Sequence, residues 1–327
     1  DFVRPLAEDL QAIEDDLGRR AEAFGRYYNP SLVRLIRAAG FETADVKAAG
    51  GSVVVNGRPV LDFVGGVACS LRGHNPSTYA DEVVYRAVSI HTLRRELEGR
   101  LQRLTGLGNV LPAVSGGGAV ENALRTALVA RAPRRRILAL KAGFGGKTLF
   151  SLTGTANPSY KDRIGPLYAE VDYVDPFALD AVERIDALFR EHEFAAVLVE
   201  LIQSVGGVRA VPEPLLRRLD EWRRRQGCLL IVDDIQTGMY RTGPFCRSET
   251  LGLAPDLMLL GKATSDMMFP FSLTLYSDAV AESLQGRGEG LVETIRGRYG
   301  YELGYRTVVN ALQTAEEMGI SERVVRA

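Results

Sequence analysis

Seven short apolar runs between residues 110 and 277 constrain the fold of this 327-residue chain more than any other feature. They are VLPAVS (110–115), ILALKAG (137–143), AEVDYVD (169–175), AAVLVELI (195–202), CLLIVDD (228–234), LMLLGKA (257–263) and SLTLYS (272–277). Runs of this length that are apolar on both faces indicate strands of a sheet covered by helices on both sides. Five of the six connections are long enough for a crossover helix or an extended return, whereas the one through Phe269 and Pro270 is short and favours an antiparallel neighbour. We therefore predict a three-layer α/β/α domain with a mostly parallel seven-stranded sheet.

The first part of the chain has a different pattern. Leu10, Ile13 and Leu17 have helical spacing, which predicts a helix within residues 1–30. Residues 50–65 contain alternating apolar side chains around an Asn-Gly pair. That combination predicts a β-hairpin with a two-residue turn.

Composition excludes several classes of function. Forty basic and forty-one acidic side chains give a net charge of −1, so we expect no general affinity for nucleic acid or for membranes. The three cysteines and three histidines are scattered and offer neither a disulfide framework nor metal-ligand spacing. No apolar run approaches the roughly 20 residues of a membrane-spanning helix. The scarcity of cysteine predicts a cytoplasmic location.

Chemically useful residues follow the predicted strands directly. In open α/β sheets, ligands bind outside the carboxyl ends of the strands. The residues at those positions are Ser115, Gly116, Gly117 and Gly118, then Gly143, Phe144 and Gly145, then Glu200, then Asp233, Asp234 and Gln236, and finally Lys262. A glycine-rich loop, an aromatic ring, carboxylates and one lysine are thereby predicted to share one edge of the sheet.

Each of these residues allows a functional and a structural interpretation. The glycine loop precedes a predicted helix, AVENALRTALVAR, whose N-terminus suits a phosphate, although a turn that serves only the backbone fits equally well. Asp233 ends a buried strand and suits a pyridinium nitrogen, a helix cap or a structural ion pair. Lys262 ends another apolar strand, where an imine-forming amine or a lysine reaching back to solvent is possible. Phe144 suits stacking on a flat ring or packing in the core.

A nucleotide-binding loop is a rival interpretation of GFGGKT (143–148), since LLIVDD resembles a magnesium-binding strand. The full motif requires a glycine where this chain has Lys141. A helix should also begin at Lys147, yet Gly154 and Pro158 follow within a few turns. Spacing and context therefore both disfavour nucleotide binding.

The stretch CLLIVDDIQTGMYRTGPFCRSETLGLAPDLMLLGK (228–262) resembles class III, fold-type I, pyridoxal-phosphate (PLP)-dependent aminotransferases. The resemblance extends from about residue 50 to about residue 320. The family signature is matched by Asp233, Asp234, Ile235, Gln236, Thr237, Gly238, Arg241, Thr242 and Gly243. Pro255, Asp256 and Lys262 follow at the spacing of the family.

The resemblance implies a role for each candidate residue. Lys262 would hold PLP as a Schiff base and move the proton, and Asp233 would pair with the pyridine nitrogen. The other implied contacts are Gly116 and Gly117 at the phosphate, Gln236 at the ring hydroxyl, Phe144 on the ring face and Glu200 near the cofactor. The resemblance also implies a small-molecule amino donor and a keto acid acceptor.

The chain departs from the family pattern at four positions. Gly117 stands where the phosphate loop has a hydroxyl residue, and Gly145 replaces the histidine after the aromatic residue. Val205 replaces a glutamate that gates a substrate-binding arginine in many members. Arg298 replaces a threonine that reaches the phosphate of the neighbouring subunit, which implies a two-fold homodimer in which Arg298 makes that contact.

These observations predict residues 1–75 as an N-terminal segment and hairpin belonging to a partial small domain. Residues 76–310 are predicted as the large PLP-binding domain, and residues 311–327 as the start of a C-terminal small domain whose remainder is absent. We expect a transaminase that moves an amino group between an amine or amino acid and a keto acid. A second hypothesis keeps the cofactor but changes the reaction to decarboxylation, racemisation or epimerisation, or lyase chemistry. A third hypothesis is a binding protein on the same scaffold without the cofactor.

Overall fold

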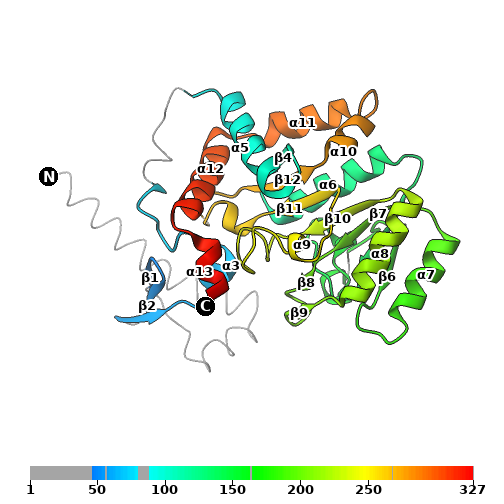
Figure 1. Cartoon of the computed structure of the whole chain (residues 1–327), viewed down its shortest axis with the longest axis horizontal. Coiled ribbons are helices and arrows are strands. Elements are labelled where there is room, and N and C mark those ends of the chain that lie inside the picture. Colours follow the sequence, from blue (N-terminus) through cyan, green and yellow to red (C-terminus); the bar gives the residue numbers. More distant parts are fainter. Residues whose placement is uncertain (1–45, 56, 80–87, 163, 267, 327) are drawn as a thin grey trace. The chain divides into compact units, whose positions relative to one another are not determined.

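The structure is a computed structural model that describes residues 46–55, 57–79, 88–162, 164–266 and 268–326 (Figure 1). The chain divides into two compact units. The first comprises residues Asp1–Val64 and Gly73–Pro76, and the second comprises Gly65–Arg72 and Ser77–Ala327. The helix predicted within residues 1–30 lies outside the described residues.

The first unit contains a three-stranded antiparallel sheet of β1 (Val46–Ala49), β2 (Ser52–Val55) and β3 (Arg58–Leu61). The pairing of β2 with β3 leaves two residues in the turn, and Gly57 has a φ of 75°, as such tight turns require. The predicted hairpin is therefore confirmed. Strand β1 was not predicted, because VKAA lacks alternation of apolar and polar residues.

The second unit is built on a seven-stranded sheet with the order β4-β12-β11-β10-β7-β5-β6. The strands are β4 (Asn109–Ala113), β5 (Arg136–Leu140), β6 (Val171–Val174), β7 (Phe194–Val199), β10 (Leu229–Asp233), β11 (Leu257–Leu260) and β12 (Ser272–Tyr276). Strand β12 pairs antiparallel with β11 and β4, and all the other pairs are parallel. Each strand overlaps one of the predicted apolar runs, so both the mostly parallel sheet and its antiparallel member are confirmed.

Helices cover both faces of this sheet because alternate strand residues point to opposite sides. Leu229 and Ile231 of β10 join the core under helix α6 (Gly116–Ala130). Leu230 and Val232 join the core under α7 (Ala181–Glu191) and α8 (Glu213–Gln226), which lie side by side in Figure 1. This is the predicted three-layer α/β/α arrangement.

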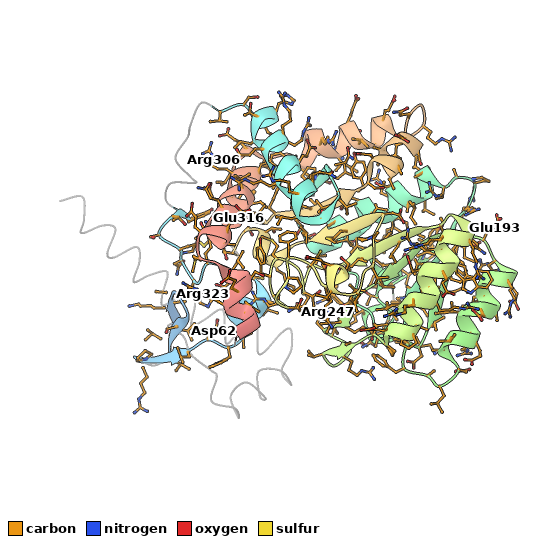
Figure 2. All side chains as sticks on the ribbon, in the orientation of Figure 1. Asp62, Glu193, Arg247, Arg306, Glu316 and Arg323 are labelled. Carbon is orange, nitrogen blue, oxygen red and sulfur yellow. The ribbon has the colours of Figure 1, made fainter. Side chains whose placement is uncertain are left out.

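Helices α5 (Ile90–Thr105) and α12 (Glu302–Glu317) pack on each other and cover β12 and β11 on the same face as α7 and α8. Arg100 of α5 forms an ion pair with Glu316 of α12 at 3.2 Å. The Glu193 side chain is 73% exposed and points outward in Figure 2. The remaining elements are α3 (Gly65–Ala68), η1 (Ser151–Gly154), η2 (Pro158–Tyr160), β8 (Ile202–Gln203), β9 (Arg209–Ala210), α9 (Arg247–Thr250), η3 (Lys262–Thr264), α10 (Asp278–Ser283), α11 (Glu289–Tyr299) and α13 (Ile320–Arg326).

Within the described part of the chain, none of the helices has both the length and the apolar character that crossing a membrane requires.

Candidate active site

A cavity of about 750 Å³ lies in the second unit and contains residues from the ends of several sheet strands. Its lining comprises Val67, Ser115, Gly116, Gly117, Phe144, Gly145, Gly146, Lys147, Thr148, Glu200, Ser204, Val205, Val208, Asp233, Ile235, Gln236 and Lys262. Seven of the eight predicted site residues are among them, and Arg298 is not. The topological rule for α/β sheets therefore brings these seven residues to one cavity, as predicted.

The glycine loop forms the start of helix α6. Ser115 is the N-cap residue, and its Oγ accepts a hydrogen bond from the Gly118 N–H at 3.1 Å. Gly146 lies against this loop with a φ of +125°, and a Cβ atom there would come within 2.8 Å of the Gly117 Cα. Two backbone segments thus approach each other at the helix N-terminus, where backbone N–H groups favour an anion.

Lys262 follows strand β11 and begins the short helix η3. Its φ of +51° is in the left-handed region, which is uncommon for a lysine and characteristic of functional sites. Its side chain is near enough to Asp233 and Glu200 to interact electrostatically with both. The strand end therefore places an amine beside two carboxyl groups.

Asp233 is the last residue of β10 and is only 6% exposed. Burial, followed by the charge of Glu200, raises the pKa of Asp233 well above its usual range, while the Ile235 N–H and Lys262 oppose that rise. The Ile235 N–H donates to Oδ1 at 3.0 Å. A buried carboxylate in these surroundings is stabilised by a further cationic partner.

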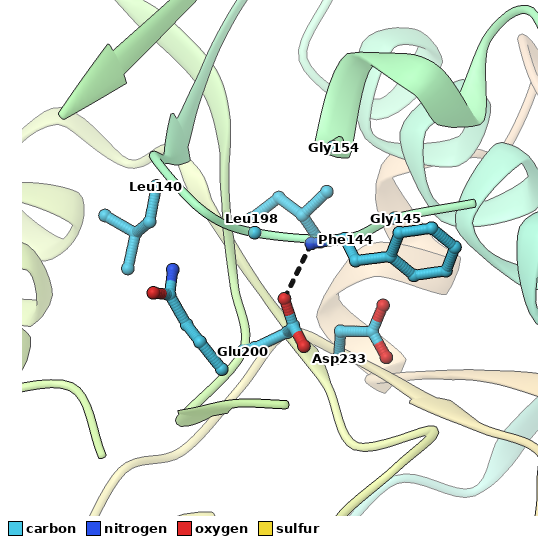
Figure 3. Close-up of a pocket in the computed structure, with 9 residues that line it drawn as sticks. Leu140, Phe144, Gly145, Gly154, Leu198, Glu200 and Asp233 are labelled. Atoms are coloured by element: carbon cyan, nitrogen blue, oxygen red, sulfur yellow. Dashed lines mark hydrogen bonds between the residues drawn. The ribbon is translucent and has the colours of Figure 1, made fainter. Parts of the chain in front are cut away.

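Glu200 connects two of the strand ends. Its Oε1 accepts a hydrogen bond from the Phe144 N–H at 2.7 Å, and Figure 3 shows Glu200 and Asp233 beside the Phe144 loop. Burial raises the pKa of Glu200 to about 7, although the N–H groups of Phe144 and Ser204 and the charge of Lys262 lower it. The Phe144 ring is thereby held at the cavity by a contact between loops that are distant in sequence.

Asp234, the neighbour of Asp233, has a different role. Its Oδ1 accepts a hydrogen bond from the Thr237 hydroxyl at 2.7 Å, and it does not line the cavity. Burial raises the pKa of Asp234 to about 6. Of the two adjacent carboxylates, only Asp233 faces the site, which alternation along an extended strand end explains.

Sequence reasoning missed several lining residues. Lys147 and Thr148 belong to the GFGGKT segment, but neither was assigned a role in the site from the sequence. The structure supports the rejection of a nucleotide-binding loop, because a short 3₁₀ helix (Ser151–Gly154) follows Thr148 in place of a long helix. The Thr148 hydroxyl donates to the Glu121 carboxylate, which anchors this loop to α6. The position of Lys147 and Thr148 directly after the Phe144-Gly145-Gly146 segment is the sequence feature that could have predicted both residues as part of the cavity lining.

Arg298 lies in the last turn of α11 and is exposed. It does not line the cavity of its own chain. Its predicted contact involves a second copy of the chain and stays a prediction.

The class III aminotransferase profile matches residues 38–297. Aminotransferase PigE of Serratia sp. is 30% identical over 287 residues, which are 84% of this chain and 33% of PigE. A [LysW]-aminoadipate semialdehyde/glutamate semialdehyde transaminase of Sulfurisphaera tokodaii is 32% identical over 246 residues, covering 72% of this chain and 62% of that protein. The chain belongs to the class III aminotransferase family. It spans a third of the length of PigE and less than two thirds of the Sulfurisphaera protein.

Solved structures show the same fold. An amine transaminase from an uncultivated Pseudomonas species, determined in its PLP-bound form, superposes with a TM-score of 0.74 at 24% identity, covering 86% of this chain and 72% of that one. The ornithine aminotransferase of Toxoplasma gondii gives a TM-score of 0.73 at 22% identity, covering 93% of this chain and 75% of that one.

The cofactor of the family is PLP, and the cavity suits it. The N-terminus of α6 offers a site for the phosphate, and glycine at position 146 lets a second backbone segment approach Gly117 closely there. Asp233 offers the buried carboxylate that a pyridinium nitrogen requires. Lys262 offers the amine for a Schiff base. The glycine loop, Asp233 and Lys262 line one cavity, so a single PLP molecule could contact all three.

Proposed function

We propose that this protein is a transaminase that moves an amino group between an amine or amino acid and a keto acid. The observation that carries the proposal is the presence of Lys262, Asp233 and the glycine loop in one cavity. The matched relatives that are named aminotransferases support it. When bound, PLP supplies an electron sink that accepts the charge released at the substrate carbon.

Lys262 and Asp233 are the proposed catalytic residues. With PLP bound, Lys262 would hold the cofactor as a Schiff base, and as a free amine it would move the proton at the substrate carbon. Asp233 would pair with the pyridine nitrogen and keep that nitrogen protonated. The left-handed backbone at Lys262 aims its side chain from the end of β11 into the cavity.

The other site residues hold and orient the cofactor. Their proposed contacts are the phosphate for Gly116 and Gly117, the ring hydroxyl for Gln236, the ring face for Phe144 and the ring surroundings for Glu200. The hydrogen bond from the Phe144 N–H to Glu200 holds the loop that carries the aromatic ring.

Absorbance spectroscopy tests the proposal. The purified protein with PLP should show an imine band that an amino donor removes and a keto acid restores. Restoration by the keto acid identifies transamination. If the donor loses carbon dioxide, is racemised or is cleaved while the keto acid restores nothing, the alternative PLP reactions are correct. Absence of an imine band would leave the scaffold as a binding protein.

A two-fold homodimer completes the proposal. The cations lining the cavity from the described residues of one chain are Lys147 and Lys262, and Lys262 is assigned to the Schiff base. Arg298 of a second copy, exposed at the end of α11, would add positive charge at the phosphate.

We expect Arg298→Ala to weaken PLP affinity by about 1.5–3 kcal/mol, the scale of a charge-assisted hydrogen bond. Equilibrium titration of PLP with the two proteins measures this, and Arg287→Ala is a control on another arginine beyond the cavity lining. A monomeric protein in solution, or equal affinities, would contradict the assignment.

The domain assignment and the location are also proposals. Residues 1–75 and 311–327 are assigned to a small domain and residues 76–310 to the large PLP-binding domain. The three free cysteines, Cys69, Cys228 and Cys246, support a reducing cytoplasm.

A further inference from the structure

The backbone around Lys262 is held in a conformation that side chains disfavour. Lys262 has a φ of +51°, and Asp266, four residues further on, has a φ of +50°. Left-handed backbone is uncommon for any residue other than glycine, and it persists where the surrounding structure enforces it. Two left-handed residues therefore flank the turn of helix η3, in which Ala263 and Thr264 are buried.

The contacts within this turn are local. The Ser265 N–H donates to the Lys262 carbonyl at 3.3 Å, which is long for a hydrogen bond of this kind. The Thr264 hydroxyl donates to the Phe271 carbonyl at 2.5 Å. Both bonds close the turn on itself, and neither connects it to a distant part of the chain.

Asp266 ties the turn to a segment that lies about 195 positions earlier in the sequence. Its carboxylate accepts hydrogen bonds from the N–H groups of Leu71 and Arg72, the second at 2.9 Å, and from the Arg72 Nε at 2.6 Å. The side chains of Arg72 and Asp266 are 1% and 0% exposed. A buried ion pair resists displacement, because moving one partner leaves the other charge buried and uncompensated.

The segment that precedes Arg72 is strained as well. The four residues from Gly65 to Ala68 all have φ angles between 56° and 62°, so α3 is a left-handed turn. The Cys69 N–H closes this turn by donating to the Gly65 carbonyl at 2.9 Å. Glycine adopts such a backbone freely, whereas Val67 and Ala68 do so at a cost in free energy.

A second distant side chain enforces the left-handed turn. The Arg241 guanidinium donates to the carbonyl oxygens of Ala68 and Ser70 at 3.2 and 3.0 Å. Charged side chains from much later in the chain thus hold the segment at two points, Arg241 at its middle and Asp266 at its end.

The two strained backbones meet beside the cavity. Helices α3 and η3 are in contact, and Val67 of the first and Lys262 of the second line the cavity. Burial raises the pKa of the Cys69 thiol, while the charges of Lys262 and Arg241 lower it, so α3 lies within electrostatic reach of the lysine amine. The ion pair therefore anchors the backbone from which the Lys262 side chain projects.

From this geometry we propose that Arg72 and Asp266 are positioning residues: their ion pair holds the left-handed backbone at Lys262 and so keeps its amine where the PLP aldehyde binds. The inference rests on the proposed role of Lys262 and adds what orients it. Imine formation joins the Lys262 nitrogen to the aldehyde carbon and releases the aldehyde oxygen as water, with no change in oxidation state. An amine that is already held in place loses less orientational freedom in this step, which favours the imine.

The test compares PLP binding with and without the lysine. Asp266→Asn keeps an oxygen for the N–H groups of Leu71 and Arg72 but removes the charge that pairs with the guanidinium. Equilibrium dialysis of the cofactor-free full-length protein against PLP gives Kd for the original protein, Asp266→Asn, Lys262→Ala and the double variant. We expect Asp266→Asn to raise Kd by about tenfold or more where Lys262 is present, and by less than about twofold in the Lys262→Ala background.

The imine absorbance provides a second readout. After rapid mixing with PLP, the imine band should appear about tenfold or more slowly in Asp266→Asn than in the original protein. Asp256→Asn is the matched control, because Asp256 likewise accepts hydrogen bonds from a guanidinium and a backbone N–H, those of Arg223 and Leu230, both at 2.8 Å. Asp256 does not line the cavity, so Kd and the rate should change by less than about twofold.

Arg72→Lys breaks the ion pair from its other side, in case Asp266→Asn fails to fold. Lysine keeps the positive charge but lacks the planar N–H groups of the guanidinium. A rise in Kd of about threefold or more, confined to protein that carries Lys262, is the expected result. Thermal melting of each cofactor-free variant shows whether it is folded.

Three outcomes would overturn the inference. Equal rises in Kd with and without Lys262 would show that the ion pair supports the cavity as a whole. An unchanged Kd in both backgrounds would show that the lysine is oriented without the pair. A comparable rise in Asp256→Asn would assign the effect to a general loss of stability. In each case an imine band in the original protein leaves the proposed function intact, whereas a missing band contradicts that function and the inference with it.

Discussion

Two carboxylates in the same unit have opposite surroundings. Asp186, on the outer helix α7, accepts hydrogen bonds from Arg218 at 2.6 and 2.8 Å and from the Trp222 indole N–H at 2.6 Å. These contacts, first of all the hydrogen bond from Arg218, lower the pKa of Asp186 to about 2. Asp233, at the end of β10, is buried beside Glu200, and burial raises its pKa well above the usual range.

The difference distinguishes an acid that stabilises the fold from an acid that is proposed to bind the cofactor. The neighbouring helix supplies Asp186 with a cation and a second donor, so its charge is already stabilised by the protein. Asp233 has one backbone donor and the charge of Lys262, which is assigned to other chemistry. A pyridinium group would supply the positive charge that stabilises the ionised Asp233 carboxylate.

The most severe test of this comparison removes the lysine beside Asp233. Lys262→Ala should abolish the imine absorbance and lower turnover by about a thousandfold or more, because the Schiff base and the proton carrier are both lost. Circular dichroism and thermal melting should show an intact fold. Lys161→Ala, outside the cavity lining, is the control. Activity retained within tenfold would refute the assignment of Lys262.

The next largest effect is expected for Asp233→Asn. The amide is neutral and cannot keep the pyridine nitrogen protonated, so proton transfer should slow by roughly 10²–10⁴-fold while PLP remains bound. Single-turnover absorbance measures the rate. Asp186→Asn is the matched control and should leave that rate unchanged. If both variants react at the original rate, Asp233 is merely structural.

Glu200→Gln extends the comparison to stability. The pKa of Glu200 is raised from 4.5 to about 7 in the folded protein, so the folded state binds more protons than the unfolded state between these values. Stability must then fall as pH rises through this range. In cofactor-free protein the variant should be more stable than the original by about 1–3 kcal/mol at pH 8 and equal to it below pH 4.5. Urea unfolding at several pH values measures the difference in the free energy of unfolding between the two proteins. A difference that does not change with pH would contradict the expectation.

Asp186→Asn should give the opposite pH dependence. The pKa of Asp186 is lowered from 3.8 to about 2 in the folded protein. Its ionised carboxylate therefore stabilises the folded state above pH 3.8, and this stabilisation is lost as the pH falls through 2. We expect the variant to be less stable by about 1–2 kcal/mol at pH 7, the scale of lost charge-assisted hydrogen bonds. The deficit should shrink as the pH approaches 2. Thermal melts across this pH range measure the deficit in stability. A deficit that stays constant down to about pH 2 would mean that the variant loses stability through altered packing.

The parts of the fold that local patterns encode were predictable from the sequence. Short runs that are apolar on both faces predicted the strands of the sheet, and the short connection through Phe269 and Pro270 predicted the antiparallel strand. The site followed from topology, because residues at strand ends meet at one edge of the sheet.

The remaining features depend on contacts between distant residues. The left-handed backbone at Val67 contradicts the preference of valine, and the supports from Arg241 and Asp266 lie about 170 and 200 positions away. Val205 was recognised only as a departure from a family pattern, since its exposure becomes visible only with the cavity. Arg298 requires a second copy of the chain and remains a prediction.

The position of β4 at the edge of the sheet has a consequence for how the protein is made. In the described sheet, β4 has β12 as its single neighbour, and Ala113 of β4 pairs with Ser272 of β12. A ribosome releases β4 long before its partner, so the nascent chain holds this strand without a sheet neighbour while the intervening residues are synthesised. The glycine loop that directly follows β4, and that is proposed to bind the phosphate, gains this strand pairing only after Ser272 has emerged. We therefore expect the nascent chain to become competent to capture the cofactor late in translation.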